Sequence, residues 1–206
     1  MIINFIAVGA VSTSGTVAVP SGYQDGDIFV LVCTGDTTVY TTPSGWTKAT
    51  GNTNTSFPVT NTFYKLVSGA QSSVVLTGGG ASKKAVMLCY RNASGLDTAV
   101  SNTGTSATVT ATNANISFIG DLDLVVFSQA TTGAAATFSG AVTGYTVRVN
   151  SAATTTACAL AIVDQLASSG LGLVSVTSTV SAAFACNASS FTPSSSGAFF
   201  LNMMED

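Results

Sequence analysis

Short apolar segments separated by turn-forming residues run along most of the chain, and apolar residues at helical spacing are almost absent. This pattern is typical of many short β-strands. The runs IFVLVC (28–33) and LVVF (124–127) are apolar at consecutive positions, which predicts central strands covered on both faces by a second sheet or a partner. The segment 108–118 alternates more, which predicts one solvent-facing side. Strands are expected near 2–8, 14–19, 27–34, 60–67, 72–77, 84–91, 107–110, 115–118, 121–128, 144–149, 156–164, 172–178, 181–187 and 197–203.

Turn signals separate these segments. Pro-Ser-Gly occurs at 20–22 and 43–45, and Gly-Gly-Gly at 78–80 is expected to be a flexible hairpin tip and not a phosphate cradle. No Pro- or Ser-rich stretch is long enough to separate two domains. We therefore expect an all-β fold in which residues 1–206 form a single jelly-roll-like β-sandwich of two antiparallel sheets.

An internal repeat with an offset of about 94–100 residues predicts that the sandwich contains a pseudo-duplicated half. A Gly-Asp pair opens IFVLV and again LDLVV, and Gly-Trp-Thr at 45–47 is echoed by Gly-Tyr-Thr at 144–146. FYKLVSGAQSSVVL is echoed by LAIVDQLASSGLGLVSV, and AVMLCYRNAS by AAFACNAS. The halves are expected at about 20–97 and 115–191. The alternative is chance, because Gly-Asp before a strand is common turn chemistry.

The composition indicates an unusual surface. Apolar residues make up 46% of the chain and charged residues only 7%, with a mean hydropathy of +0.48, whereas soluble proteins average about 25% charged residues. The surface must therefore consist largely of Ser, Thr, Asn and Gly, which lowers the desolvation cost of packing against another protein. We interpret this as a protein that belongs to an assembly. The alternative is a secreted domain of low charge.

The charge pattern argues against two classes of partner. The net charge is −3, the six basic residues are spread along the chain, and only Lys83 and Lys84 are adjacent, so we expect no nucleic-acid binding. No apolar run approaches the roughly 18 residues of a spanning helix, so we expect no membrane insertion. The N-terminal segment MIINFIAVGAVSTSG lacks a positively charged start, which favours a first strand over a signal peptide.

Candidate reactive groups are few. Histidine is absent, so the usual general base is missing and Ser/His/Asp or Cys/His arrangements are impossible. Cys33, Cys89, Cys158 and Cys186 permit two disulfides in three pairings, but each lies in an apolar run, so we expect buried, reduced thiols. Without a CxxC motif, zinc has almost no support.

Two D-x-D pairs, Asp25 with Asp27 and Asp121 with Asp123, are the remaining candidates for chemistry. Paired carboxylates could bind Ca²⁺ or hydrolyse glycosides. Both pairs stand at the start of expected strands, where Asp is ordinary turn chemistry. We therefore predict no catalytic, cofactor-binding or metal site and no enzymatic activity.

Aromatic residues offer one further possibility. Trp46 is the only tryptophan, and we expect it to plug the core near one end of the sandwich, with sugar stacking as the alternative. Tyr23 and Tyr40 are the other rings that a carbohydrate site could use if exposed. Lys65 lies in an otherwise apolar strand, so its amino group is expected to reach solvent or pair with an acid.

The order of motifs resembles a β-sandwich domain widespread in structural proteins of tailed bacteriophages. The resemblance covers most of the chain and is carried by PSGYQDGD, IFVLV, TPSGWT, FYKLVSG and AVMLCYRNASGLD in the first half, and by GDLDLVVF, ACALAIVDQL and AFACNASSF in the second. Each motif is short, and the ordered set carries the specificity. The resemblance implies a jelly-roll-like sandwich, as in head decoration proteins, head fibres and tail-fibre parts.

This resemblance implies a protein of the particle exterior, assembled in the host cytoplasm. We expect a capsid decoration or cement protein whose partners are capsid or other virion proteins, and a homo-oligomer, with a trimer favoured. One alternative is a tail-fibre or tail-tip component that binds a host surface through loops at 35–44, 50–58 and 129–143. Another is a lectin-like carbohydrate-binding module.

Overall fold

The structure is a computed structural model. It describes residues 1–36, 38–52, 58–111, 119–131, 134–139, 142–153, 157–167 and 173–195. The first half of the chain forms β1 (Asn4–Val8), β2 (Thr16–Val17), β3 (Ile28–Gly35), β4 (Thr47–Gly51), β5 (Val59–Leu66), β6 (Val74–Val75) and β7 (Lys84–Arg91). The second half forms β8 (Ala93–Ala111), β9 (Leu122–Gln129), β10 (Phe138–Ser139), β11 (Thr146–Ser151), β12 (Ala159–Leu166) and β13 (Val174–Pro193).

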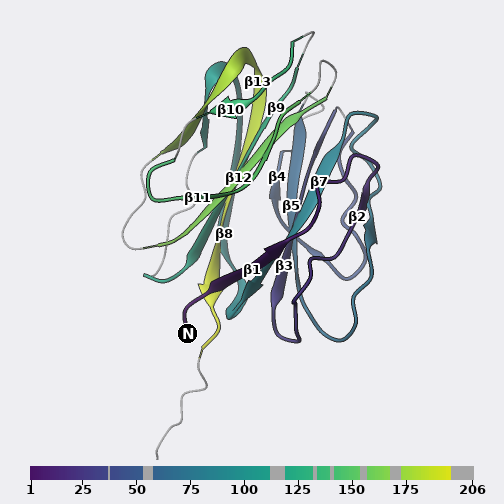
Figure 1. The fold of residues 1–206 in the computed structure, drawn as a ribbon, viewed down its shortest axis with the longest axis vertical. Coiled ribbons are helices and arrows are strands. Elements are labelled where there is room, and N and C mark those ends of the chain that lie inside the picture. Colours follow the sequence, from purple (N-terminus) through teal and green to yellow (C-terminus); the bar gives the residue numbers. More distant parts are fainter. Residues whose placement is uncertain are drawn as a thin grey trace, which may run out of the picture.

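These strands build two main antiparallel sheets, one from each half of the chain (Figure 1). Sheet one has the order β1-β7-β3-β5-β4. Sheet two has the order β13-β9-β12-β11, with β8 and β10 also paired to β13. The all-β, antiparallel class is therefore confirmed. The jelly-roll pattern is not confirmed, because the successive strands of each half remain within one main sheet.

Strand pairing in the two sheets corresponds closely. Ile28 of β3 pairs with Leu66 of β5, and Leu122 of β9 pairs with Leu166 of β12. Sheet one has a register shift where β4 meets β5, and sheet two has one where β11 meets β12. The shift between β1 and β7 likewise has a counterpart between β8 and β13. The sequence repeat thus corresponds in space to two sheets with the same strand order.

Three apolar clusters explain why the central strands are apolar on both faces. Side chains of β3 point alternately into a central cluster between the sheets, as Val30 does, and into an outer cluster, as Leu31 does. Val126 and Phe127 of β9 divide in the same way between the central cluster and a second outer one. The expected cover on both faces is confirmed.

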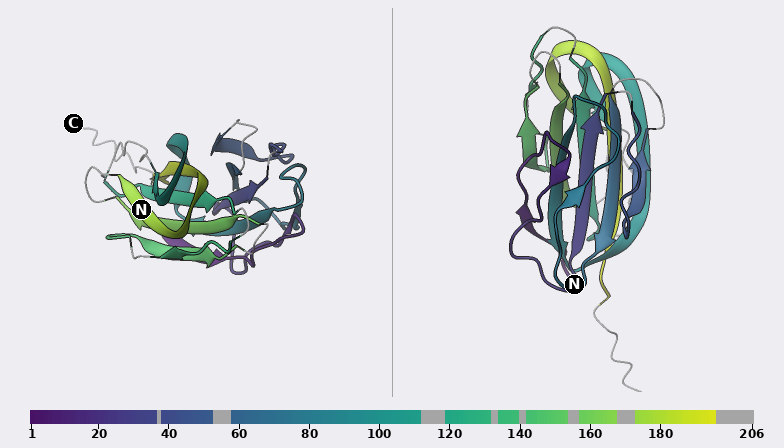
Figure 2. Two further views of the ribbon diagram at one scale, coloured as in Figure 1. Left: turned by 90° about the horizontal axis from the view of Figure 1, so that it is seen from above. Right: turned by 90° about the vertical axis from the view of Figure 1, so that its right-hand side faces the viewer.

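The chain itself supplies the outer cover of each sheet. The short ribbon of β2 and β6 places Val17 and Val74 on the outer face of sheet one. On sheet two the cover comes from the ends of β8 and β13, where Val109 pairs with Val176. Figure 2 shows these two long strands curving over the same end of the molecule.

Polar contacts join the two sheets at both ends of the central cluster. At one end, the Tyr90 hydroxyl donates to Asp164 Oδ2 over 2.7 Å. At the other, Lys84 Nζ donates to Ser151 Oγ over 2.8 Å and also to the Ala152 carbonyl. These contacts fix the sheets against sliding, because each buried donor would otherwise lose its partner.

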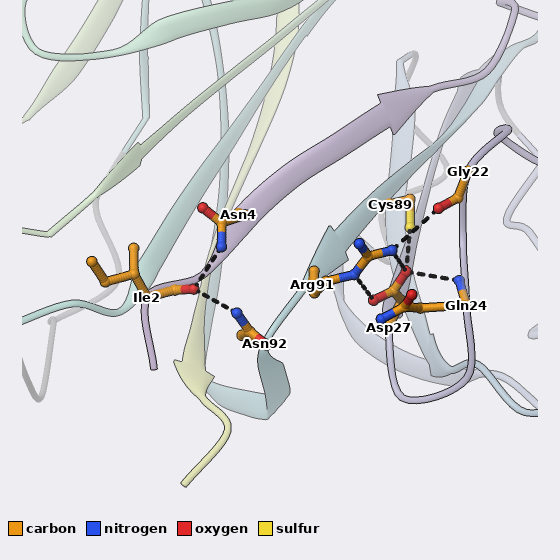
Figure 3. Close-up of polar contacts among 8 residues, drawn as sticks. All are labelled: Ile2, Asn4, Gly22, Gln24, Asp27, Cys89, Arg91 and Asn92. Atoms are coloured by element: carbon orange, nitrogen blue, oxygen red, sulfur yellow. Dashed lines mark hydrogen bonds and ion pairs between the residues drawn. The ribbon is translucent and has the colours of Figure 1, made fainter. Parts of the chain in front are cut away.

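The turn at Asn92 connects the two halves. Asn92 has a φ of 63° and is the one non-glycine residue with positive φ in the described ranges, a conformation that asparagine tolerates better than most residues. Its Nδ2 donates to the Ile2 carbonyl over 3.0 Å, and Asn4 Nδ2 donates to the same carbonyl over 3.0 Å (Figure 3). The N-terminal segment is thereby tied to the junction between the halves.

Several expected elements differ from the structure. Strand β4, strand β10 and the polar first part of β8 were not predicted, because short or Ser/Thr-rich edge strands carry no apolar run. Gly-Gly-Gly at 78–80 is not a free hairpin tip. A Cβ on Gly79 would lie 2.2 Å from the Tyr40 ring, so this turn is packed against its neighbours. The expected strands at 115–118 and 197–203 lie outside the described residues.

Candidate functional site

The first D-x-D pair does not form a shared site. Asp27 is buried and its carboxylate accepts from Arg91 Nε over 2.9 Å and from Gln24 N over 2.9 Å, while Cys89 Sγ lies 3.7 Å from Oδ2 (Figure 3). Asp25 is exposed and accepts from Gly69 N over 2.7 Å. Because Asp27 is neutralised by an arginine and bound to a turn amide, its role is structural, as turn chemistry predicts.

The second pair, Asp121 and Asp123, lies fully buried at the start of β9. Asp123 Oδ2 accepts from the Tyr145 hydroxyl. Burial raises the pKa of Asp123 to about 6, against the opposing effect of the Tyr145 hydrogen bond. Across the described ranges, no three His, Cys, Asp or Glu residues gather closely enough to hold a metal ion.

A third polar cluster, which the sequence analysis missed, joins β1 of the first half to β11 and β12 of the second. Arg148 Nε donates to both oxygens of buried Asp164, at 2.9 and 2.8 Å, and the guanidinium lies 3.9 Å from the centre of the Phe5 ring. Tyr90 donates to the same carboxylate, and burial followed by the Asp164 charge raises the Tyr90 pKa. The sequence signal for this cluster is that Asp164 is the only charged residue in the run LAIVDQL.

The four cysteines are free and buried, as expected. Burial raises the pKa of Cys89 and Cys158 to about 12 and raises the pKa of Cys33 and Cys186 as well. A thiol with a raised pKa stays protonated at neutral pH and is a poor nucleophile. None of the four is a candidate catalytic group.

The three aromatic candidates have different environments. Tyr40 is buried, and its hydroxyl donates to the Thr34 carbonyl over 2.7 Å, so it does not meet the condition of exposure that a carbohydrate site would require. Tyr23 is half-buried against Phe29, with ring centres 5.2 Å apart. Trp46 is half-buried on the outer cluster of sheet one, so it is only partly the core plug that was expected.

Trp46 lines a pocket of about 470 Å³ on the outer face of sheet one. We name it the Trp46 pocket. Its lining includes Phe29 and Met87 from the sheet, Lys65 from the end of β5, and Ser44 and Gln71 from the neighbouring turns. This volume lies within the roughly 300–1,000 Å³ range of small-molecule sites.

Of the two alternatives expected for Lys65, reaching solvent or pairing with an acid, the structure shows a half-buried side chain bonded to an amide. Its Nζ donates to Gln71 Oε1 over 2.8 Å. The two ion pairs of the described residues involve other cations, Arg91 with Asp27 and Arg148 with Asp164.

The free edge of β8 is the second candidate surface. In the part of the chain that the structure describes, β8 pairs only with β13. Residues 98–106 pair without a register shift and contain no charged residue and no proline. The edge strands β1, β4 and β11 each have five or six residues and a register shift. Proteins commonly protect long edges with charges, bulges or proline, and this run has none of them.

The pairing also identifies which backbone groups of β8 face outward. Ala130 N donates to the Ala183 carbonyl, so the odd-numbered residues of this part of β13 direct their backbone groups away from β8. The even-numbered residues of β13 direct their backbone groups toward β8. One of them, Phe184, pairs with Gly104, so the even-numbered residues of this part of β8 face β13. Thr103 and its odd-numbered neighbours on β8 therefore direct N–H and C=O groups outward.

The loops proposed for host binding are only partly described. Residues 37, 53–57, 132–133 and 140–141 lie outside the described residues. Within 35–44, Asp36 Oδ2 accepts from Ala81 N over 2.9 Å, so this segment is fastened to the glycine turn.

Comparison with protein-family models, curated proteins and solved structures found no match to this chain. The described residues include no helix that is long and apolar enough to cross a membrane.

Proposed function

We propose that this chain is a non-enzymatic structural protein on the exterior of a virus particle, where it decorates or cements the capsid. The observation that carries the proposal is the outer edge of β8, where the uncharged run 98–106 pairs with β13 without a register shift and its odd-numbered residues direct backbone groups away from β13. The motif order that resembles tailed-phage sandwich proteins supplies the viral context. The jelly-roll description belongs to that resemblance and is part of the proposal.

The proposed mechanism is strand addition. A strand of a capsid subunit, or of a second copy of this chain, extends sheet two at β8 through main-chain hydrogen bonds. Low surface charge reduces the desolvation cost, and burial across subunit joints stabilises the shell by mass action. We expect a homo-oligomer, with a trimer favoured, on capsid or other virion proteins and without nucleic-acid or membrane partners.

A substitution at Thr103 tests the edge directly. Thr103→Pro removes one outward N–H while leaving the hydrogen bonds between β8 and β13 in place, since proline is tolerated at a solvent-facing edge position. We expect at least a tenfold loss of binding to capsids or of self-association, measured by sedimentation. Thr103→Ala keeps the N–H and is the matched control, expected to bind like the wild type. Equal binding by the proline variant would reject docking through β8.

Particles lacking the protein test the cementing role. We expect such particles to lose genome at lower temperature or pressure than complete particles, and added protein to restore resistance. Unchanged resistance would reject cementing. A protein that binds host cells and ignores capsids would instead favour the tail-fibre alternative.

A further inference from the structure

The Trp46 pocket combines a half-buried aromatic ring, a cation and polar turn residues on the outer face of sheet one. We propose that it binds an acidic saccharide, with the sugar ring against Trp46 and its carboxylate against Lys65. This inference goes beyond the proposed docking function, because the pocket lies on sheet one and the β8 edge on sheet two.

The floor and one wall of the pocket suit the apolar face of a sugar. Phe29 and Met87 are buried in the outer cluster beneath it. Trp46 is positioned by a turn in which its backbone N–H donates to the Pro43 carbonyl over 3.1 Å. A pyranose presents C–H groups on its face and hydroxyls around its rim, which matches an aromatic wall with polar groups around it.

The polar lining residues Lys65 and Gln71 are held in place before any ligand arrives. Gln71 N donates to the Tyr23 hydroxyl over 2.9 Å, and Gln71 Nε2 donates to the carbonyls of Ser68 and Gly69 over 2.6 and 3.1 Å. Gln71 Oε1 accepts from Lys65. Because these bonds fix the amide and the lysine, little side-chain freedom remains to be lost on binding.

Lys65 supplies the specificity for an acid. An ammonium group has three donors, and the bond to Gln71 uses one of them. In the described residues, the two ion pairs join Asp27 to Arg91 and Asp164 to Arg148. Lys65 takes part in neither, so its charge is available to a ligand. A carboxylate-bearing sugar would make a charge-assisted hydrogen bond there.

The second half of the molecule shows that the fold does not require these residues. Register places Asp123 at the position of Phe29, Gln165 at that of Lys65, and Tyr145 at that of Trp46. There the Tyr145 hydroxyl donates to the Asp123 carboxylate. The combination of indole and lysine is thus particular to the first half, which favours a role beyond packing.

Because Trp46 is the only tryptophan, its fluorescence reports on the pocket without labelling. The probes are sialyllactose, a galacturonic acid disaccharide and neutral lactose. We expect a saturable emission change with at least one acidic probe, a weaker or absent change with lactose, and weakening as salt rises. The isolated chain is used, so failure here leaves docking at β8 untouched.

Lys65→Gln places in the pocket the residue found at the equivalent position of sheet two. We expect a tenfold or greater loss of affinity for the acidic probe, and partial retention in Lys65→Arg. Lys48→Gln, on the neighbouring strand β4 and outside the pocket lining, is the control and is expected to bind like the wild type. Calorimetry on each variant measures affinity independently of the fluorophore.

Three results would overturn the proposal. The first is no saturable change with either acidic probe at concentrations to about 10 mM, which corresponds to affinity too weak to matter. The second is lactose binding as tightly as sialyllactose. The third is unchanged affinity in Lys65→Gln while circular dichroism shows the same fold.

Discussion

At the scale of single residues, burial decides what the ionisable groups do. Asp27 and Asp164 are buried with arginine partners, whereas Asp123 faces a tyrosine hydroxyl and has a raised pKa. In a buried carboxyl group without a cationic partner, the ionised form is less stable than it would be in water. Asp123 therefore makes stability depend on pH in a direction opposite to that of a salt-bridged acid.

We predict that Asp123→Asn stabilises the protein at neutral pH. The folded pKa of Asp123, about 6, exceeds the unfolded value of 3.8, so the folded state binds more protons between these values. Its contribution to stability is most favourable below pH 4 and is lost as pH rises through 6. Near pH 7.5, the variant should gain about 3 kcal/mol, at 1.36 kcal/mol per pKa unit over about two units.

Urea unfolding of both proteins from pH 4 to pH 8 measures this difference. We expect the two curves to converge near pH 4 and to separate as pH rises. A constant difference across this range would show that the carboxyl does not titrate as proposed.

At the scale of elements, the cover of sheet two depends on Gln129. This buried side chain stands where β8 and β13 bend, and its Nε2 donates to the carbonyls of Ser106, Val180 and Ala182 over 2.8, 3.0 and 3.3 Å. The bend explains why a strand segment as long as β8 can serve both as the edge of a sheet and as its cover.

Gln129→Met should therefore loosen the cover. Methionine fills a similar volume but takes the buried amide donor away from this group of carbonyls, at a cost of about 1–3 kcal/mol. We expect a lower urea midpoint, with backbone amides of 107–111 exchanging hydrogen faster than those of β9. Gln165→Met, at a half-buried position on β12, is the control and should change stability by about 0.5 kcal/mol or less. Equal midpoints for the two variants would contradict the role of Gln129.

The elements also show where prediction from sequence succeeded. The ranges expected for β3, β7 and β9 lie within one residue of the observed bounds, because a run that is apolar at consecutive positions must be covered on both faces. The polar strand β4 and the first part of β8 were missed. Their strand conformation comes from hydrogen bonding to β5 and β13, and residues far along the chain supply those bonds.

At the scale of the whole molecule, the four thiols report on global unfolding. Cys33 and Cys89 lie in the outer cluster of sheet one and Cys186 in that of sheet two, and Cys158 is buried as well. Burial raises the pKa of all four thiols. We predict that a thiol reagent such as Ellman's labels none of them in the native protein at pH 8 and all four in urea. Fast labelling of one cysteine without urea would show local opening near it. Addition of a reductant should leave the melting temperature unchanged.

The two halves match in strand order but differ in the polarity of their contacts. Where β7 faces β12, Val86 and Ile162 pack in the central cluster, and the one polar contact described there, from Tyr90 to Asp164, lies at its end. At the corresponding place between β5 and β13, Asn187 Nδ2 donates to Thr62 Oγ1 over 3.3 Å. The repeat therefore describes the shared framework, and the packing of one half on the other gives each side its own chemistry.

The amino-acid sequence alone determined the strand class and the central strands, because these follow from local apolar runs and turns. It also determined that few reactive groups exist. Only the tertiary structure decided which carboxylates meet an arginine, that Tyr40 is buried while Trp46 lines a pocket, and that β8, among the described strands, pairs only with β13. These outcomes depend on contacts between residues far apart in the chain, which no local pattern encodes.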